Sequence, residues 1–251
     1  MRTKSFLVVL AVSFLPLRVQ SAEVSSLLQD ADALDREGKN QQALACCLEA
    51  EKLAPEDPEV LRRVAKQYAE TVLDARDETA KRSIAEKAVG YAKRAVAAGP
   101  KNALTHLSLA ICYGRAATVA DAKTKIAYSK LIKQHADSAL ALDPKNDLTY
   151  FVLGSWCYEM ASLNGFLRAL ARVIYGAVPT ATYKEAARYL EKAVALNPKR
   201  VSNHAALGRT YAALGDRDRA RQSLTTALSL PDGDKADAIV KQQARKDLMK
   251  L

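Results

Sequence analysis

The stretch DLTYFVLGSWCYEMASLNGFLRALARVIYGAVPTATYKEAARYLEKAVALNP, residues 147–198, decides how the rest of the chain is interpreted. Its beginning and its end each have the apolar spacing of an amphipathic helix, and a proline follows the second helix. An apolar segment separates these two helices. Shorter versions of the same plan, without that segment, precede and follow it, so the chain is predicted to repeat one helical unit.

Prolines mark the repeat, because a similar phrase precedes most of them. The phrases AEKLAP, AVAAGP, ALALDP and AVALNP end at Pro55, Pro100, Pro144 and Pro198, and the shorter ALSLP ends at Pro231. Only 6% of the residues are aromatic, and alanine and leucine are abundant, which favours helices over sheets. Recurring phrases of this kind are typical of stacked helical hairpins.

The last copy shows the plan of one unit. Its first helix carries a row of packing residues, namely His204, Leu207, Gly208 and Tyr211. Gly215 suits a left-handed helix end and Asp216 the start of the next helix, whose packing face is Ala220, Leu224 and Ala227. This pattern matches tetratricopeptide repeats of about 34 residues.

We therefore predict an all-α protein, an α-solenoid of about five tetratricopeptide-like hairpins with an inserted amphipathic helix and a C-terminal capping helix. The predicted units are 24–57, 58–102, 103–146, 147–200 and 201–232, with the capping helix at 234–251. The inserted helix alternates apolar and basic residues; its apolar residues include Phe166, Leu167, Leu170 and Ile174.

The first 22 residues have the plan of a secretory signal peptide. Arg2 and Lys4 precede the apolar run 6–17, and the small residues Ser21 and Ala22 follow it. This pattern predicts an exported protein, periplasmic or secreted, with residues 23–251 as its mature repeat domain. A mitochondrial or membrane-anchoring signal is the alternative, which would place the protein at an organelle surface.

The composition limits the classes of partner. The 38 basic and 28 acidic residues give a net charge of +10, which indicates a solvated basic surface or a preference for acidic partners. No long run of lysine and arginine marks a patch, so we expect no specific nucleic-acid binding. The four cysteines, Cys46, Cys47, Cys112 and Cys157, form no C-x-x-C pair and are interpreted as small apolar packing residues, although export would permit a disulfide.

The fourth unit resembles the regulator of microtubule dynamics family. The resemblance lies in LGSWCYEMA at 153–161, the inserted helix ending at Tyr175 and Gly176, and PTATYKEA at 179–186. It implies an all-helical repeat fold, no catalytic activity and, for eukaryotic relatives, an association with microtubules or organelle surfaces. It transfers no binding residue, and export would separate the protein from the family's cytoskeletal role.

The sequence contains none of the common catalytic, nucleotide-binding or zinc-binding motifs. His106, His135 and His204 lie far apart in the sequence, and His106 and His204 occupy equivalent repeat positions, which indicates a packing role. We therefore predict a non-enzymatic scaffold protein without a metal site, a cofactor or catalytic residues.

The first helix of each unit should line the concave surface of the solenoid. The residues predicted to face it are basic at both ends and apolar in the middle: Arg62, Lys66, Leu104, Leu107, Ile111, Phe151, Tyr158 and Arg209. Two interpretations remain open at this point. Either the inserted helix fills this groove, or a protein or peptide segment with acidic flanks binds there. A weaker third hypothesis places the inserted helix on a membrane surface.

Overall fold

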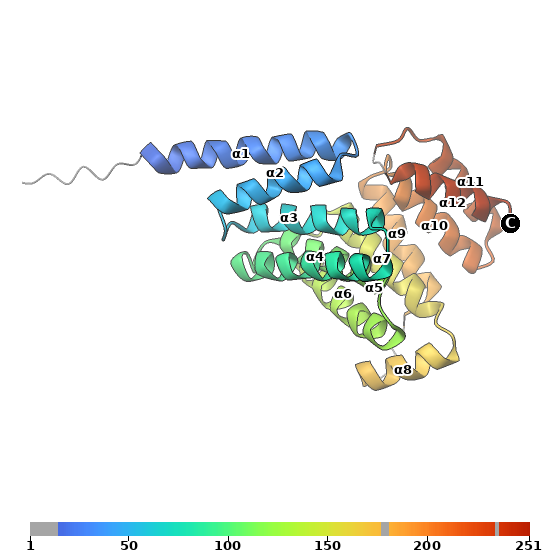
Figure 1. The fold of residues 1–251 in the computed structure, drawn as a ribbon. Coiled ribbons are helices and arrows are strands. Elements are labelled where there is room, and N and C mark those ends of the chain that lie inside the picture. The colour runs from blue at the N-terminus through green and yellow to red at the C-terminus, as the bar shows by residue number, and fades with distance from the viewer. Residues whose placement is uncertain (1–14, 177–180, 234–235) are drawn as a thin grey trace, which may run out of the picture.

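The computed structural model describes residues 15–176, 181–233 and 236–251 (Figure 1). These residues form twelve α-helices and one short 3₁₀-helix, and no strand occurs among them. The helices are α1 (Leu15–Arg36), α2 (Asn40–Leu53), α3 (Pro58–Thr71), the 3₁₀-helix η1 (Val72–Asp74), α4 (Glu78–Ala98), α5 (Ala103–Ala117), α6 (Ala122–Leu142), α7 (Asp147–Ala161), α8 (Gly165–Tyr175), α9 (Tyr183–Leu196), α10 (Val201–Ala213), α11 (Arg217–Ser229) and α12 (Asp237–Leu248). The predicted all-α fold is confirmed.

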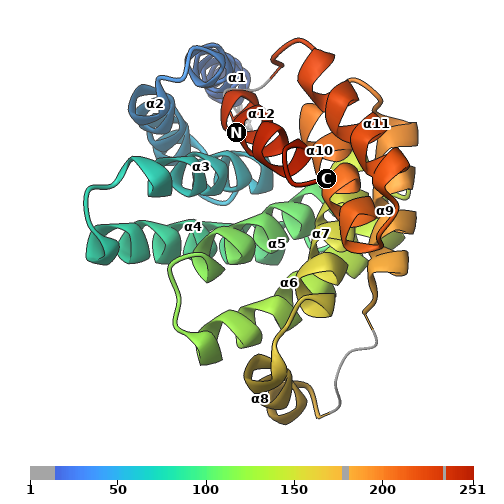
Figure 2. The same ribbon diagram turned by 90° about the vertical axis from the view of Figure 1, so that its right-hand side faces the viewer.

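The helices pack as hairpins that stack into an arc. The pairs are α1 with α2, α3 with α4, α5 with α6, α7 with α9, and α10 with α11. The first helices also touch one another, α3 with α5, α5 with α7 and α7 with α10. Neighbouring helices are closest on the inner side of an arc, so these first helices line the concave surface, as Figure 2 shows.

Two glycines set the distance between the helices of the last two hairpins. A Cβ on Gly208 would lie 2.7 Å from Cγ of Leu224 and 3.1 Å from the carbonyl oxygen of Ala220. A Cβ on Gly154 would meet Leu190 in the same way, at 2.6 Å from Cγ. The last two hairpins therefore pair a glycine on the first helix with a fully buried leucine on the second. A larger side chain at either position would push the two helices apart.

The turns follow the predicted local signals. Gly215 has φ of +80° and ends α10, and Asp216 caps α11 by accepting a hydrogen bond from the amide of Arg219 at 3.1 Å. Thr182 and Glu185 form a reciprocal capping box at the start of α9, which satisfies two amides that the helix leaves unpaired.

A hydrogen bond recurs six residues after the proline of three units. His106 and His204 donate from Nε2 to the carbonyl oxygens of Pro100 and Pro198, at 3.0 and 2.8 Å. Tyr150 uses its hydroxyl in the same way on Pro144, at 3.2 Å. The equivalent histidines His106 and His204 therefore have a structural role: each hydrogen-bonds the turn between two hairpins to the helix that follows it.

The core consists of small and branched side chains between successive hairpins. Leu61, Leu153, Leu190 and Leu224 are fully buried. Cys47, Cys112 and Cys157 are buried with them as free thiols, and burial raises their pKa values to about 12, 12 and 11. Their role in the structure is packing, as the sequence indicated.

The inserted helix does not fill the groove, so that interpretation was wrong. α8 packs on α6 at the edge of the molecule, at the bottom of both Figure 1 and Figure 2. The C-terminal helix α12 instead packs on α10 and α11, and Figure 2 shows it on the inner side of the arc. The apolar residues Leu170 and Ile174 of α8 pack instead with Ile126 of α6 and Trp156 of α7.

The N-terminal prediction falls partly outside the described residues. Residues 1–14 are not described, and α1 begins at Leu15, so the predicted boundary at Ala22 lies within this helix. Among the helices described, none combines the length and the apolar character needed to cross a bilayer.

Candidate partner-binding surface

The concave surface brings together residues from α3, α5, α7 and α10. These four helices carry all eight residues predicted from the sequence, but the surroundings of these residues differ from one end to the other. The N-terminal end carries Arg62 and Lys66, the middle Leu104, Leu107, Ile111 and Phe151, and the C-terminal end Tyr158 and Arg209.

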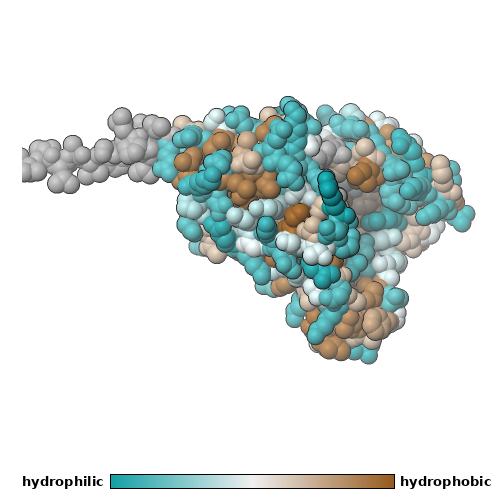
Figure 3. All heavy atoms as spheres, viewed as in Figure 1, coloured by the Kyte–Doolittle hydropathy of each residue, from teal (hydrophilic) through white to brown (hydrophobic). Residues whose placement is uncertain are grey.

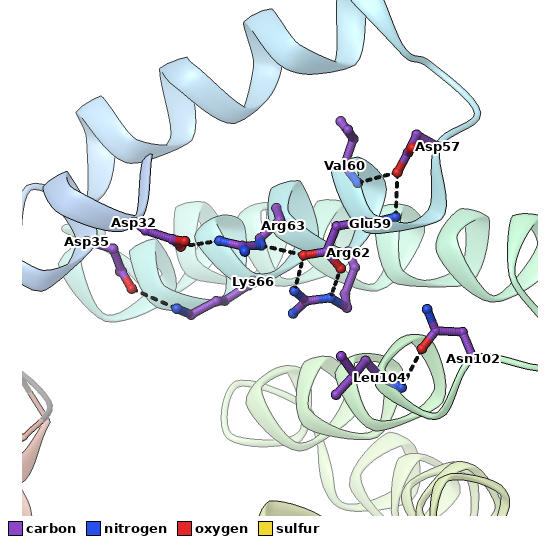
Figure 4. A network of polar contacts seen from close by, with 10 residues as sticks. All are labelled: Asp32, Asp35, Asp57, Glu59, Val60, Arg62, Arg63, Lys66, Asn102 and Leu104. Carbon is purple, nitrogen blue, oxygen red and sulfur yellow. Dashed lines mark hydrogen bonds and ion pairs between the residues drawn. The ribbon is translucent and has the colours of Figure 1, made fainter. Parts of the chain in front are cut away.

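At the N-terminal end, every predicted cation already has an anion. Figure 4 shows Arg62 of α3 gripping Glu59 with two nitrogens, at 2.7 and 2.5 Å. Nζ of Lys66 lies 2.7 Å from the carboxylate of Asp35 on α1. The first pair lies within α3 and the second joins α3 to α1, and both leave their cations less free to hold an acidic partner.

Arg63, which the sequence did not single out, links the same groups. It pairs with Asp32 of α1 and, at 2.6 Å, with Glu59. Burial alone would raise the pKa of Glu59, but Arg62 and Arg63 outweigh that effect and hold the pKa below its usual value. Three carboxylates and three cations meet here, so the N-terminal end of the surface carries almost no net charge.

The middle of the surface is apolar and partly open. Leu104 and Ile111 on α5 are 40% and 37% exposed, which is high for large aliphatic side chains. Leu107 between them is only 4% exposed, so it supports the surface from below and cannot contact a partner. Phe151 of α7 is half-buried against the core of the last hairpins. The open apolar strip is therefore narrower than the sequence predicted.

At the C-terminal end, Arg209 and Tyr158 line a pocket of about 400 Å³ between α7, α10 and the end of α12. The guanidinium of Arg209 lies 4.5 Å from the centre of the Tyr158 ring. Stacking of this kind holds an arginine in place without neutralising its charge. Burial raises the pKa of Tyr158 and the neighbouring Arg209 acts against this, so the phenol stays neutral at physiological pH.

Three cations and one side-chain carboxylate line the pocket, and the cations form no ion pair among the described residues. Within the described residues, Nε of Arg209 is buried and has no hydrogen-bond partner. Arg217 and Lys250 also line the pocket, and neither forms an ion pair in the described part of the chain. Asp247 is the acidic member of the lining, and it accepts a hydrogen bond from Gln243 at 2.8 Å.

Arg217 and Lys250 were missed from the sequence for different reasons. Arg217 follows the left-handed turn at Gly215, and nothing in the repeat pattern shows that this turn opens into a pocket. Lys250 lies in the C-terminal segment, and the position of this segment on the inner side of the arc is set by tertiary packing. The only sequence signal was the basic character of both segments.

The inserted helix lies apart from this surface. Of its residues, Leu170 and Ile174 pack beside Ile126 and Trp156, with Ala171 fully buried, whereas Phe166 is 71% exposed. Leu167 is partly buried. Trp156 is 8% exposed and donates from Nε1 to the carbonyl oxygen of Ser129 at 2.8 Å, which fits its predicted place in the core.

The described residues offer no cluster of three or more metal-ligating side chains. One juxtaposition was missed from the sequence, because Nδ1 of His106 lies 3.1 Å from Nδ1 of His135 across the α5–α6 hairpin. Since Nε2 of His106 donates to Pro100, its Nδ1 accepts the hydrogen from His135. Burial and the nearby His106 lower the pKa of His135, which favours this neutral pair.

Comparison with known proteins identifies the family. Residues 27–251 match the family described as regulator of microtubule dynamics protein 1–3. The chain belongs to the regulator of microtubule dynamics family. Mouse regulator of microtubule dynamics protein 1 is 30% identical over 226 residues, covering 89% of this chain and 73% of that protein. The cattle protein is 30% identical over 224 residues, covering 88% and 70%.

Regulator of microtubule dynamics protein 3 of Xenopus laevis is 30% identical over 218 residues, but the match spans only 47% of that longer protein. A solved tetratricopeptide-repeat protein of Thermus thermophilus superposes with a TM-score of 0.65 at 19% identity, covering 90% of this chain and 99% of its own. The resemblance to the regulator family is thus confirmed, and the structural likeness confirms the tetratricopeptide-type fold. The curated relatives are named as regulators of microtubule dynamics, and the solved structure is named as a tetratricopeptide-repeat protein.

Proposed function

We propose that this protein is an adaptor that binds an acidic, partly apolar segment of another protein on its concave surface. One observation carries the proposal: the 400 Å³ pocket is lined by Arg209, Arg217 and Lys250, and none of them forms an ion pair in the described residues. The inner helix α5 adds the exposed apolar side chains of Leu104 and Ile111. A carboxylate in this pocket would pair with the guanidinium of Arg209 and with the charged ends of Arg217 and Lys250.

The family and the fold support this proposal at the level of protein interaction. The structure changes its details, because Arg62 and Lys66 are engaged by Glu59 and Asp35. The acidic part of the partner is therefore assigned to the C-terminal end alone. Its apolar part is assigned to Leu104, Ile111 and Phe151, in the manner of an amphipathic segment lying in a groove.

The test uses a fluorescein-labelled peptide, EELLAFLAEE, and its basic counterpart, KKLLAFLAKK. Anisotropy titrations of the full chain should show at least about tenfold tighter binding of the acidic peptide at low salt. Replacing Arg209, Arg217 and Lys250 by glutamate should abolish this preference. A matched variant with the same charge change at the exposed Lys101, Lys145 and Lys199, in the turns between hairpins, is the control.

Equal affinity for the two peptides would refute the proposal. It would also be refuted if the control variant lost as much binding as the pocket variant, because a diffuse positive field would then explain the preference. Circular dichroism of each variant establishes that it remains folded.

A second candidate function comes from the relatives, whose names refer to the regulation of microtubule dynamics. Co-sedimentation with polymerised microtubules, in wild type and in the pocket variant, tests whether this chain shares that role. If wild type binds microtubules and the pocket variant does not, the same pocket serves both peptide binding and microtubule binding. If the protein does not sediment with microtubules, it does not share the role that the names of its relatives describe.

The compartment decides between these roles. The signal-like residues 1–22 favour export, and the family match begins at residue 27, just beyond them. The names of the animal relatives refer to microtubules, which supports the alternative, a protein that is not exported and lies at a mitochondrial or other organelle surface. N-terminal sequencing of the mature protein with cell fractionation distinguishes the two, because export predicts a new N-terminus near Glu23, and an intact Met1 in the cytosol would exclude it.

A further inference from the structure

The inserted helix α8 has two apolar sides, and only one of them is used inside the protein. Its inner side packs on α6 through Leu170, Ala171 and Ile174, with Ala171 fully buried. On its outer side, Phe166 is 71% exposed and Val173 is 79% exposed. Figure 3 shows apolar residues gathered over α8 at the bottom of the view.

α8 is a well-defined helix. The side chain of Asn164 caps its first turn by accepting from the amide of Leu167 at 3.0 Å, and Gly176 ends it with φ of +80°. Because both ends are capped and the inner side is anchored, the outer residues are presented in a fixed arrangement. Phe166 and Val173 are seven residues apart, which is two helical turns, so they lie on the same side.

The charge around these outer residues is positive. α8 carries Arg168 and Arg172 and no acidic residue, and both arginines are exposed. The guanidinium of Arg168 donates to the carbonyl oxygens of Ala161 and Leu163, at 3.4 and 3.5 Å, so it also holds α8 to the end of α7. Arg172 has no such contact among the described residues.

The neighbouring helix α6 adds charges of both signs. Lys123 is exposed one turn before Ile126, the residue that packs against α8. Asp121 supplies a carboxylate at the start of α6, where it caps the helix by accepting from the amide of Thr124 at 3.0 Å, and Glu159 supplies an exposed one near the end of α7. The surroundings of Phe166 and Val173 therefore keep an excess of positive charge.

We propose that the outer side of α8 docks on an anionic lipid bilayer. Phe166 and Val173 would enter the boundary between headgroups and acyl chains, and Arg172 would lie at the level of the lipid phosphates. The shape favours a flat surface over a groove, since α8 projects from the edge of the molecule in both ribbon views. At 11 residues, or about 16 Å, the helix lies on a membrane and does not span it.

The test is flotation of the full chain with vesicles of phosphatidylcholine alone, and with vesicles in which about a third of the lipid is phosphatidylserine. Wild type should float with the anionic vesicles and bind neutral ones at least about tenfold more weakly. The double variant Phe166→Asp with Val173→Asp should lose this binding. The matched control is Ile239→Asp on α12 with Met249→Asp at the residue after this helix, where the two side chains are 64% and 85% exposed.

Arg172→Glu should weaken binding to the anionic vesicles and leave the weak binding to neutral ones unchanged. The proposal is overturned if wild type does not float, or if the α8 double variant floats as well as the control. Light scattering of the protein without vesicles tests whether a second copy of the chain binds the outer side of α8 instead. A dimer that the α8 double variant abolishes would assign this side to self-association and overturn the membrane assignment. Thermal unfolding of each variant shows that its fold is retained.

Discussion

The two ends of the concave surface look alike in the sequence and differ in the structure. Both contribute basic residues from the inner helices, Arg62 and Lys66 at one end and Arg209 at the other. At the N-terminal end, Asp32, Asp35 and Glu59 neutralise the cations. At the C-terminal end, the guanidinium of Arg209 rests on the Tyr158 ring and faces a 400 Å³ pocket.

The difference shows that a basic residue becomes a binding group only if the fold leaves its charge uncompensated. A cation already bonded to a carboxylate must break that bond before it can bind a ligand, so little net affinity results. An arginine held by an aromatic ring keeps its charge and loses little further conformational freedom on binding. The following experiments test this contrast, from the largest expected effect to the smallest.

Gly208→Ala should selectively damage the C-terminal end. The added Cβ would lie 2.7 Å from Cγ of Leu224, which forces α10 and α11 apart and should lower the free energy of unfolding by about 1–3 kcal/mol. Gly90 on α4 is the matched control, because nothing lies within 4 Å of a Cβ placed there. Gly90→Ala should stabilise the protein by about 1 kcal/mol. Urea unfolding measures both, and a loss of stability in the control would contradict the packing argument.

Arg209→Ala should weaken binding of the acidic peptide about tenfold, equivalent to about 1.4 kcal/mol, because it removes the pocket cation that is held by the Tyr158 ring. Lys66→Ala should change the affinity less than about twofold, since its ammonium is already bonded to Asp35. Titration of the same labelled peptide measures both. Similar losses in the two variants would mean that the ends are equivalent.

Asp32→Asn with Asp35→Asn should make the N-terminal end resemble the C-terminal end. Removing two carboxylates frees Lys66 and leaves Glu59 to be shared by Arg62 and Arg63, so this end gains positive charge. The acidic peptide should therefore bind about threefold more tightly at low salt, and the gain should vanish at high salt. Glu37→Gln, at an exposed residue outside this network, is the control. An unchanged affinity would show that freed charge alone does not create a site here.

A fall in pH should loosen the hairpin between the two ends. Because the pKa of His135 is lowered in the folded protein, the unfolded chain binds a proton first as the pH falls below about 6.5. The contribution of neutral His135 to the free energy of unfolding is thus complete above that pH and is lost as the pH falls toward the pKa of the folded state. This free energy should fall by less than about 1.4 kcal/mol per pH unit. Thermal unfolding of wild type and His135→Gln between pH 7.5 and 5 should show a smaller decrease in the variant. Parallel curves would remove His135 as the cause.

The hairpins could be predicted from the sequence because their determinants are local. The pairing of Gly208 with Leu224, the turn at Gly215 and the capping box at Thr182 all depend on residues a few turns apart. The candidate site could be predicted only in part. Arg209 and Tyr158 were identified, whereas Leu107 proved to be buried, and Arg217 and Lys250 were not anticipated.

The sequence by itself determined the repeat, the family resemblance and the amphipathic character of α8, because periodic small and large side chains specify how each helix packs against its neighbours. Tertiary structure decided which charges cancel, where α8 and α12 lie, and that His106 meets His135. Those outcomes depend on distances between residues about 30 or more positions apart. The accumulated angle between hairpins sets such distances, and no local pattern in the chain encodes that sum.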